Sequence, residues 1–336
     1  MAGATVQAAE FVEPRSAVEA ILEVQQPDGM IPWFPGGHAD PWNHVEAVMA
    51  LAATGELAAA TRGLEWLARR QRADGSWHAA YDHDGGVEEA RVDTNAVAYV
   101  ATGVLEYLWA GGDPDFAGDM FCVVDRALDF VVSLGAPDGA IPWSVAPGGR
   151  PAAFSLLAAS SSIYQSLGSG VRLAASLGLE RPAWTEAAAR VGRLVTGRES
   201  FFADNAQFAM DWYYPALAGV LGLGAARVRL RARLGEFVVP DRGVLCRSDR
   251  RWVTTAETAE CAVALARVGW ADEALALLAT TDGLRCGDGS YLTGLVFPER
   301  SEFPPGERTS YSAAAVVLAG DVLSGGVTAA VFDRLG

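Results

Sequence analysis

The chain has 336 residues, of which 51% are hydrophobic, and it carries a formal net charge of −15. It contains no lysine, which excludes a Schiff-base lysine and a P-loop lysine, and its acidity argues against nucleic acid as the main partner. No apolar run reaches the roughly 18 residues of a transmembrane segment, and no signal-peptide pattern is present. We therefore expect a cytoplasmic protein, and peripheral contact with a membrane stays open.

Apolar residues recur at helical spacing in about twelve segments, and the segments alternate between two kinds. One kind is amphipathic, with Arg and Glu on one face, as in residues 16–25, 62–71, 123–135, 184–195, 226–237 and 271–283. The other kind is rich in Ala, Gly and Ser, with polar residues crowded at its start, near Trp42, Asp93, Ser160, Asp211, Thr255 and Arg308. Helices that are apolar on all sides are buried, and one-sided helices cover them.

This alternation predicts an all-α fold, an (α/α)6 barrel (toroid) of six inner and six outer helices with short, hairpin-like Asp-Gly turns. No linker interrupts the pattern, so we expect residues 1–336 to form a single domain. The inner helices of such a barrel run parallel. Their polar N-terminal ends therefore meet at one mouth, where we expect a pocket for a small molecule.

The segment from 62 to 77 carries a motif with Arg62-Gly63, Trp66-Leu67, Gln71, Gly75 and Trp77. It resembles the QW motif of the terpenoid cyclase and protein prenyltransferase superfamily, whose members are α-toroids. In that family the Gln and Trp are structural, and the resemblance implies the same role for Gln71 and Trp77. The family's Asp-x-Asp-Asp acid motif and its magnesium and zinc motifs are absent from this sequence. Because these motifs are missing, we expect acid–base chemistry that needs neither a metal nor a cofactor.

The first two inner helices begin with candidate site residues. Trp42, His44 and Glu46 open the first, and we expect them to contact substrate, although Asp40 and Pro41 in the same stretch suit a helix cap. His38 and His44 are not at metal-ligand spacing, so we expect no metal site. The second helix begins with Asp93, a candidate catalytic carboxylate or cap, and Asn95, a candidate substrate ligand.

The third and fourth inner helices supply aromatic candidates. Tyr164 follows a run of serines in the third. In the fourth, Asp211 precedes Trp212, Tyr213 and Tyr214, which suits a catalytic carboxylate within an aromatic wall.

The last two inner helices complete the set. Glu257 and Glu260 lie three residues apart on one helical face, so each carboxyl shifts the other's pKa, as acid–base catalysis requires. Trp252 precedes them, and Arg308 and Tyr311 open the sixth helix as substrate ligands.

Three hypotheses about function follow. The first is a terpenoid-cyclase-like or prenyltransferase-like enzyme, in which a carboxylic acid protonates an isoprenoid in the central cavity. The second is a glycoside hydrolase or other carbohydrate-active enzyme, in which Asp211 and Glu257 form the acid–base pair. The third is a toroid that binds a ligand without catalysis. A pocket rich in hydrogen-bonding side chains favours the sugar, and a closed apolar pocket favours the isoprenoid.

Overall fold

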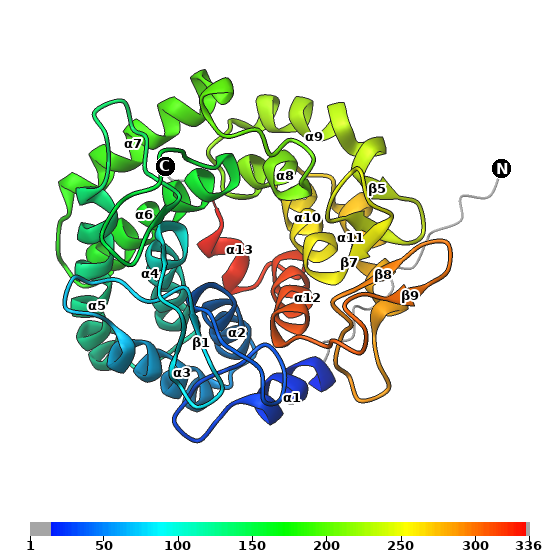
Figure 1. Cartoon of the computed structure of the whole chain (residues 1–336), viewed down its shortest axis with the longest axis horizontal. Coiled ribbons are helices and arrows are strands. Elements are labelled where there is room, and N and C mark those ends of the chain that lie inside the picture. Colours follow the sequence, from blue (N-terminus) through cyan, green and yellow to red (C-terminus); the bar gives the residue numbers. More distant parts are fainter. Residues whose placement is uncertain (1–14, 334–336) are drawn as a thin grey trace.

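The computed structural model describes residues 15–333, and its central feature is a closed ring of six parallel helices (Figure 1). Each inner helix packs against the next, and the last packs against the first. The ring consists of α2 (Pro41–Ala53), α4 (Thr94–Trp109), α6 (Leu157–Ser176), α8 (Ala209–Leu217), α10 (Thr255–Arg267) and α12 (Ser310–Leu323). The predicted (α/α)6 barrel is therefore confirmed.

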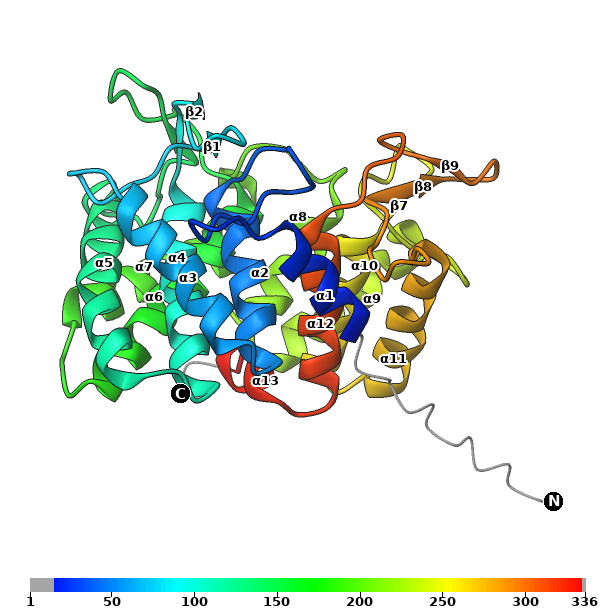
Figure 2. The ribbon, with the colours of Figure 1, turned by 90° about the horizontal axis from the view of Figure 1, so that it is seen from below.

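A second layer of helices covers the ring, and α1 closes this layer by packing against α12. The outer helices are α1 (Arg15–Val24), α3 (Leu57–Arg70), α5 (Pro114–Ser133), α7 (Pro182–Gly197), α9 (Leu223–Phe237) and α11 (Ala271–Ala279), with 3-10 turns η1 (Glu199–Phe201) and η2 (Thr280–Leu284). The short helix α13 (Val327–Val331) contacts α2, α4 and α12 at the end of the ring opposite the raised loops (Figure 2).

All the strands of the described residues lie at the end of the barrel where the inner helices begin (Figure 2). Two pairs are short: β1 (Ala80–Tyr81) with β2 (Val87–Glu89), and β3 (Val92–Asp93) with β4 (Ser144–Val145). A five-stranded antiparallel sheet contains β5 (Val238–Val239), β6 (Gly243–Leu245), β7 (Trp252–Thr254), β8 (Gly294–Val296) and β9 (Ser301–Glu302). This sheet is larger than the isolated hairpins that the sequence predicts.

Four Asp-Gly turns connect the layers with the same geometry. In each turn the Asp carboxylate accepts a hydrogen bond from the backbone N–H two residues later, and the Gly has φ between +88° and +97°. Each Gly lies so close to the backbone of an outer helix that a Cβ would overlap it. The pairs are Gly29 with Arg62, Gly75 with Arg126, Gly139 with Arg190, and Gly289 with Ser16.

The segment 62–77 is one of these connections. Gln71 Nε2 donates to the carbonyl of Gly75 at 2.9 Å and to that of Val123 on α5 at 2.8 Å. The buried Trp77 donates its indole N–H to Leu67 on α3 at 2.8 Å. Gln71 and Trp77 therefore fasten the turn between α3 and α5, in the structural role that the motif implies.

Two further properties bear on the sequence-based expectations. No helix within residues 15–333 is long and apolar enough to cross a membrane. The cysteines Cys122, Cys246, Cys261 and Cys286 are all free thiols.

The docking of the Asp-Gly turns yields a prediction about stability. Gly139→Ala should lower the free energy of unfolding by about 3 kcal/mol or more, because Ala is disfavoured at φ +97° and its Cβ would lie 2.4 Å from the Arg190 carbonyl oxygen. Gly149→Ala is the matched control: Gly149 has φ +79° and open space around it, so the cost should be only about 1 kcal/mol. Urea unfolding of both variants measures the difference. Equal losses would show that the contact with α7 contributes nothing.

Candidate active site

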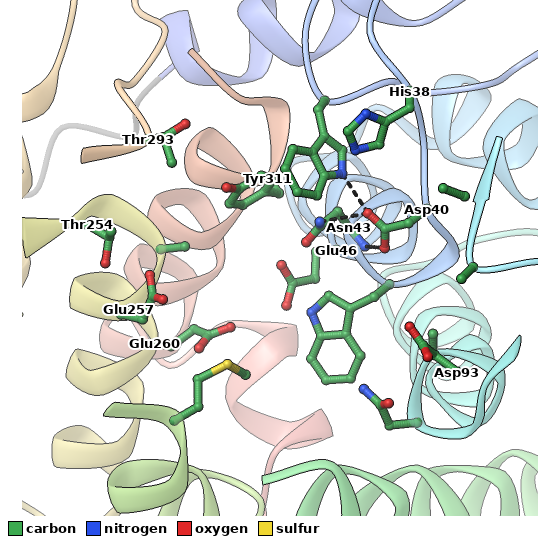
Figure 3. A pocket seen from close by; sticks show the side chains of 18 of the residues that line it. His38, Asp40, Asn43, Glu46, Asp93, Thr254, Glu257, Glu260, Thr293 and Tyr311 are labelled. Atoms are coloured by element: carbon green, nitrogen blue, oxygen red, sulfur yellow. Dashed lines mark hydrogen bonds between the residues drawn. The ribbon is translucent and has the colours of Figure 1, made fainter. Parts of the chain in front are cut away.

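A cavity of about 500 Å³ opens at the end of the barrel where the inner helices begin (Figure 3). Its walls come from the first turns of α2, α4, α8, α10 and α12 and from the loops and strands above them. The lining residues include Trp33, His38, Asp40, Trp42, Asn43, Glu46, Glu89, Asp93, Asn95, Trp143, Met210, Trp252, Thr254, Glu257, Glu260, Thr293 and Tyr311. The predicted gathering of polar residues at one mouth is thus present.

On the α2 wall, the carboxylate of Asp40 is held by three donors. The indole N–H of Trp33 donates at 2.5 Å, and Asn43 donates its backbone N–H at 3.0 Å and its amide at 2.8 Å. Asp40 is also the N-cap of α2, with Pro41 in the first helical turn. Burial raises the pKa of Asp40, and the hydrogen bonds from Asn43 and Trp33 oppose that rise. The side chain is therefore fixed at the mouth.

On the α10 wall, Glu257 and Glu260 project from successive turns. Burial raises the pKa of Glu260 to about 8, although the hydroxyl of Tyr213 donates to its Oε2. Across the cavity, burial and the proximity of Glu260 and Asp40 raise the pKa of Glu46 well above its usual range. Figure 3 shows Glu46 between Asp40 on one side and Glu257 and Glu260 on the other. In both Glu46 and Glu260 the shift of the pKa favours the protonated carboxyl.

On the α4 wall, Asp93 forms an ion pair with Arg91, whose guanidinium lies 4.6 Å from the ring centroid of Trp143. Asp93 occupies the N-cap position of α4 but makes no capping hydrogen bond. Nearby, Asn95 Oδ1 has no hydrogen-bond partner within residues 15–333. Thr254, on the α10 side, is 2% exposed, and its hydroxyl is likewise unpaired in the described chain. Both residues line the cavity, and each contributes a buried polar atom of the kind that an ordered water or a ligand satisfies.

Aromatic rings surround these polar groups. Trp42 stacks on the buried Tyr99 with ring centroids 4.1 Å apart, and Tyr311 meets Trp33 edge-on at 4.9 Å. Trp143 and Trp252 enter the cavity from the loop before α6 and from β7. Sugars are bound by this combination of apolar rings and orienting polar groups.

Eight of the predicted site residues line this cavity. They are Trp42, Glu46, Asp93, Asn95, Trp252, Glu257, Glu260 and Tyr311. Two others lie just outside it: Tyr213 bonds to Glu260, and Tyr214 borders a small chamber of about 30 Å³ beneath Glu46 and Glu260.

Asp211 lies outside the cavity, contrary to the sequence-based expectation. It borders a separate pocket of about 230 Å³ near Glu199 and Arg229, and its Oδ1 accepts the backbone N–H of Ala158 at 3.1 Å. Burial raises its pKa to about 6. Because α8 is apolar on nearly every side, its sequence does not indicate which face points into the cavity. In the structure Met210 lines the cavity from this helix.

Four predicted substrate ligands also lie elsewhere. His44 Nδ1 accepts the N–H of Ile31 at 3.1 Å and its Nε2 donates to the carbonyl of Gly63 on α3 at 3.0 Å. Trp212 donates to the carbonyls of α9 and stacks on Phe237, and Tyr164 packs beside Gly192 of α7. These three face outer helices, and Arg308 forms an exposed ion pair with Asp288 at 2.9 Å.

Sequence reasoning missed several lining residues, although a signal for them was present. The residue five positions after each Asp of the four Asp-Gly turns lines the cavity: Trp33, Ala79, Trp143 and Thr293. The residue three positions after the Asp is buried in every copy: Ile31, Trp77, Ile141 and Tyr291. Alignment of the turns alone would have separated packing residues from cavity residues.

Comparison with known proteins gives a consistent result. The chain is 42% identical over 310 residues to an MMP endo-(1,4)-3-O-methyl-α-D-mannosidase of Mycolicibacterium hassiacum, covering 92% of this chain and 86% of that one. Among solved structures, a glycosidase in complex with glucose matches with a TM-score of 0.74 at 15% identity, covering 93% of this chain and 96% of that one. A D-mannose isomerase matches with a TM-score of 0.70 at 11% identity, covering 91% and 96%. No family model matches the sequence.

The resemblance to terpenoid cyclases and protein prenyltransferases is therefore wrong as a family assignment, and so is isoprenoid protonation as the activity. The motif at 62–77 led to the wrong family because Gln71 and Trp77 have a structural role, which any toroid of helix pairs can use. They hold a turn against the next outer helix, and neither residue lines the cavity.

The position of His44 yields a prediction about pH. Burial lowers its pKa to about 4, so the folded protein keeps it neutral while the unfolded chain protonates it near pH 6.5. The neutral, buried His44 stabilises the folded state most above pH 6.5. Between pH 7 and pH 4.5 its contribution to the free energy of unfolding should fall by about 2–3 kcal/mol. The destabilisation caused by His44→Asn should therefore be smaller at pH 4.5 than at pH 7, in urea unfolding. If His44→Asn lowered the free energy of unfolding equally at both pH values, the lowered pKa of His44 would be contradicted.

Proposed function

Since the chain belongs to the family of the endo-(1,4)-3-O-methyl-α-D-mannosidase and is a glycosidase-type (α/α)6 enzyme, we propose that it hydrolyses internal α-1,4 bonds of 3-O-methyl-mannose chains. The observation that carries the proposal is the open cavity in which α2 and α10 present carboxyl groups from different sides. A glycosidase needs two carboxyl groups in this relation, one to protonate the departing oxygen and one to act on the other face of the sugar.

We assign the acid to Asp40 and the base to Glu257. Asp40 is the N-cap of α2 and Glu257 lies in the first turn of α10, so both are at the end of the cavity where the inner helices begin. Asp40 is oriented by Trp33 and Asn43, and its raised pKa suits a group that delivers a proton. Glu46 is buried more deeply, and Glu260 is engaged by Tyr213, so neither is as well placed for the cleaved bond.

The proposed reaction is a direct displacement by water. Glu257 removes a proton from the water, whose oxygen bonds to the anomeric carbon. The bond from that carbon to the bridging oxygen breaks, and Asp40 protonates the departing oxygen. The two carboxyl groups then return to their starting states by exchanging protons with solvent. A single displacement of this kind inverts the anomeric configuration, and we propose that outcome for this enzyme.

The remaining groups support binding. Burial raises the pKa of Glu46 and Glu260, and in its protonated form each can donate a hydrogen bond to a sugar hydroxyl. Asn95 and Thr254 add polar side chains to the cavity lining. Met210, with small side chains such as Ala79, provides apolar surface. A methyl ether replaces a hydroxyl donor with an apolar group, so a mixed lining of this kind suits a partly methylated sugar.

Substitution of the carboxyl groups tests the proposal. Asp40→Asn and Glu257→Gln should each lower kcat/KM on a 3-O-methyl-mannose chain by roughly 100-fold or more, because each removes one proton transfer. Asp211→Asn is the matched control, a buried carboxyl at the start of an inner helix but outside the cavity, and should keep nearly full activity. The rate at which new reducing ends are released measures the activity of all three variants. Full activity in Asp40→Asn or Glu257→Gln, or inactivity only in Asp211→Asn, would overturn the assignment.

A substrate that needs no acid separates the two roles. The fluoride of a 3-O-methyl-α-mannosyl unit leaves without protonation, so Asp40→Asn should hydrolyse it at a rate close to that of the unmodified enzyme. Glu257→Gln should not, since it lacks the group that activates water. Fluoride release measures both rates. The reverse pattern would exchange the roles of the two carboxyls.

A further inference from the structure

Two raised rims border the mouth of the cavity from opposite sides. One rim is the loop before α6, whose strand β4 pairs with β3 at the start of α4, and the other is the sheet that contains β7, β8 and β9. In the ring order, α4 lies opposite α10, which follows directly after β7. Figure 2 shows the two rims rising at the two ends of the same face.

Each rim carries a pair of aromatic rings that leads from the cavity to solvent. On the first rim, Trp143 lines the cavity and Phe154 stacks beside it, with centroids 5.7 Å apart and planes 26° apart. The backbone N–H of Trp143 donates to the carbonyl of Phe154 at 3.0 Å, which fixes the pair. Phe154 is 43% exposed.

The second rim repeats the arrangement with different contacts. Trp252 lines the cavity, and Phe303 meets it edge-on with centroids 5.2 Å apart. The indole N–H of Trp252 donates to the carbonyl of Phe303 at 3.0 Å. Phe303 is 49% exposed.

In each pair the exposed phenylalanine extends the apolar surface of a cavity-lining tryptophan toward solvent. Apolar sugar faces, and methyl ethers above all, bind to such rings because both surfaces leave water together. The inner ring of each pair lines the same cavity as the proposed catalytic carboxyls Asp40 and Glu257. A sugar chain that contacts both rims therefore crosses the mouth of the cavity that holds these carboxyls.

We propose that Phe154 and Phe303 are the outer sugar-binding platforms of a cleft that crosses the cavity from rim to rim. Under this proposal the substrate is a chain held on both sides of the cleaved bond, and a substrate that fills only the cavity does not use the platforms. The inference rests on the proposed function, which it extends by assigning the residues that select long chains.

The experiment compares long and short substrates in three variants. Phe154→Ala and Phe303→Ala should each weaken binding of a 3-O-methyl-mannose octasaccharide roughly 10-fold or more, measured by calorimetry in the Asp40→Asn background. Hydrolysis of the short glycosyl fluoride by the same two variants, in the otherwise unmodified enzyme, should be unchanged. Phe201→Ala is the matched control, an exposed phenylalanine at η1 outside the cavity lining, and should alter neither quantity.

The outcomes separate this inference from the proposed function. Unchanged octasaccharide binding in both platform variants, or equal losses for the long and short substrates, would overturn the platforms even if the enzyme cleaves the chain. If the unmodified protein binds the octasaccharide but cleaves nothing, weaker binding in Phe154→Ala and Phe303→Ala would support the platforms, and the hydrolase assignment would fail. Circular dichroism of each variant confirms that it is folded.

Discussion

The close contact between a turn glycine and the backbone of an outer helix is the constraint on which the rest of the structure depends. In four of the connections the glycine has a positive φ and lies where a Cβ would overlap a carbonyl of the neighbouring helix. An Asp side chain closes the turn from inside. The chain then re-enters the barrel in a fixed register: the third residue after the Asp is buried, and the fifth reaches the cavity. The repeated turn therefore sets both the packing between the layers and the identity of the cavity wall.

The cavity brings several carboxyl groups together from different inner helices. Asp40 is oriented by Trp33 and Asn43 while burial raises its pKa, and Asp93 forms an ion pair with Arg91. Within residues 15–333 no ion pair is formed by Glu46 or Glu260, and burial raises the pKa of both. A raised pKa suits a carboxyl that delivers a proton, which is the role proposed for Asp40 in glycoside hydrolysis. The aromatic rings around these groups provide the apolar surface that a sugar ring needs.

The architecture could be predicted from sequence because it rests on local patterns, namely the alternation of apolar and amphipathic helices and the recurring Asp-Gly turns. The site could be predicted only in part. Where an inner helix begins at a polar cluster of its own, as at Glu46 and Glu257, the prediction placed the residue in the cavity correctly. Where an inner helix is apolar on all sides, as α8 is, the sequence does not indicate which face points into the cavity. Asp211 and Trp212 were for this reason expected in the cavity, and the structure places both outside it. The family resemblance failed for a related reason: it rested on residues that fasten helices, which report the architecture and carry no information on the chemistry.

The account's central claim is that a sugar chain lies across the mouth of the barrel with its cleaved bond between Asp40 and Glu257. A crystal structure of the Asp40→Asn variant with a bound 3-O-methyl-mannose oligosaccharide tests it most directly. The account predicts a bridging oxygen within hydrogen-bonding distance of residue 40, and a water molecule held by Glu257 on the opposite side of the sugar ring. A chain bound in the pocket beside Asp211, or one whose bridging oxygens all lie away from the α2 and α10 carboxyls, would contradict it.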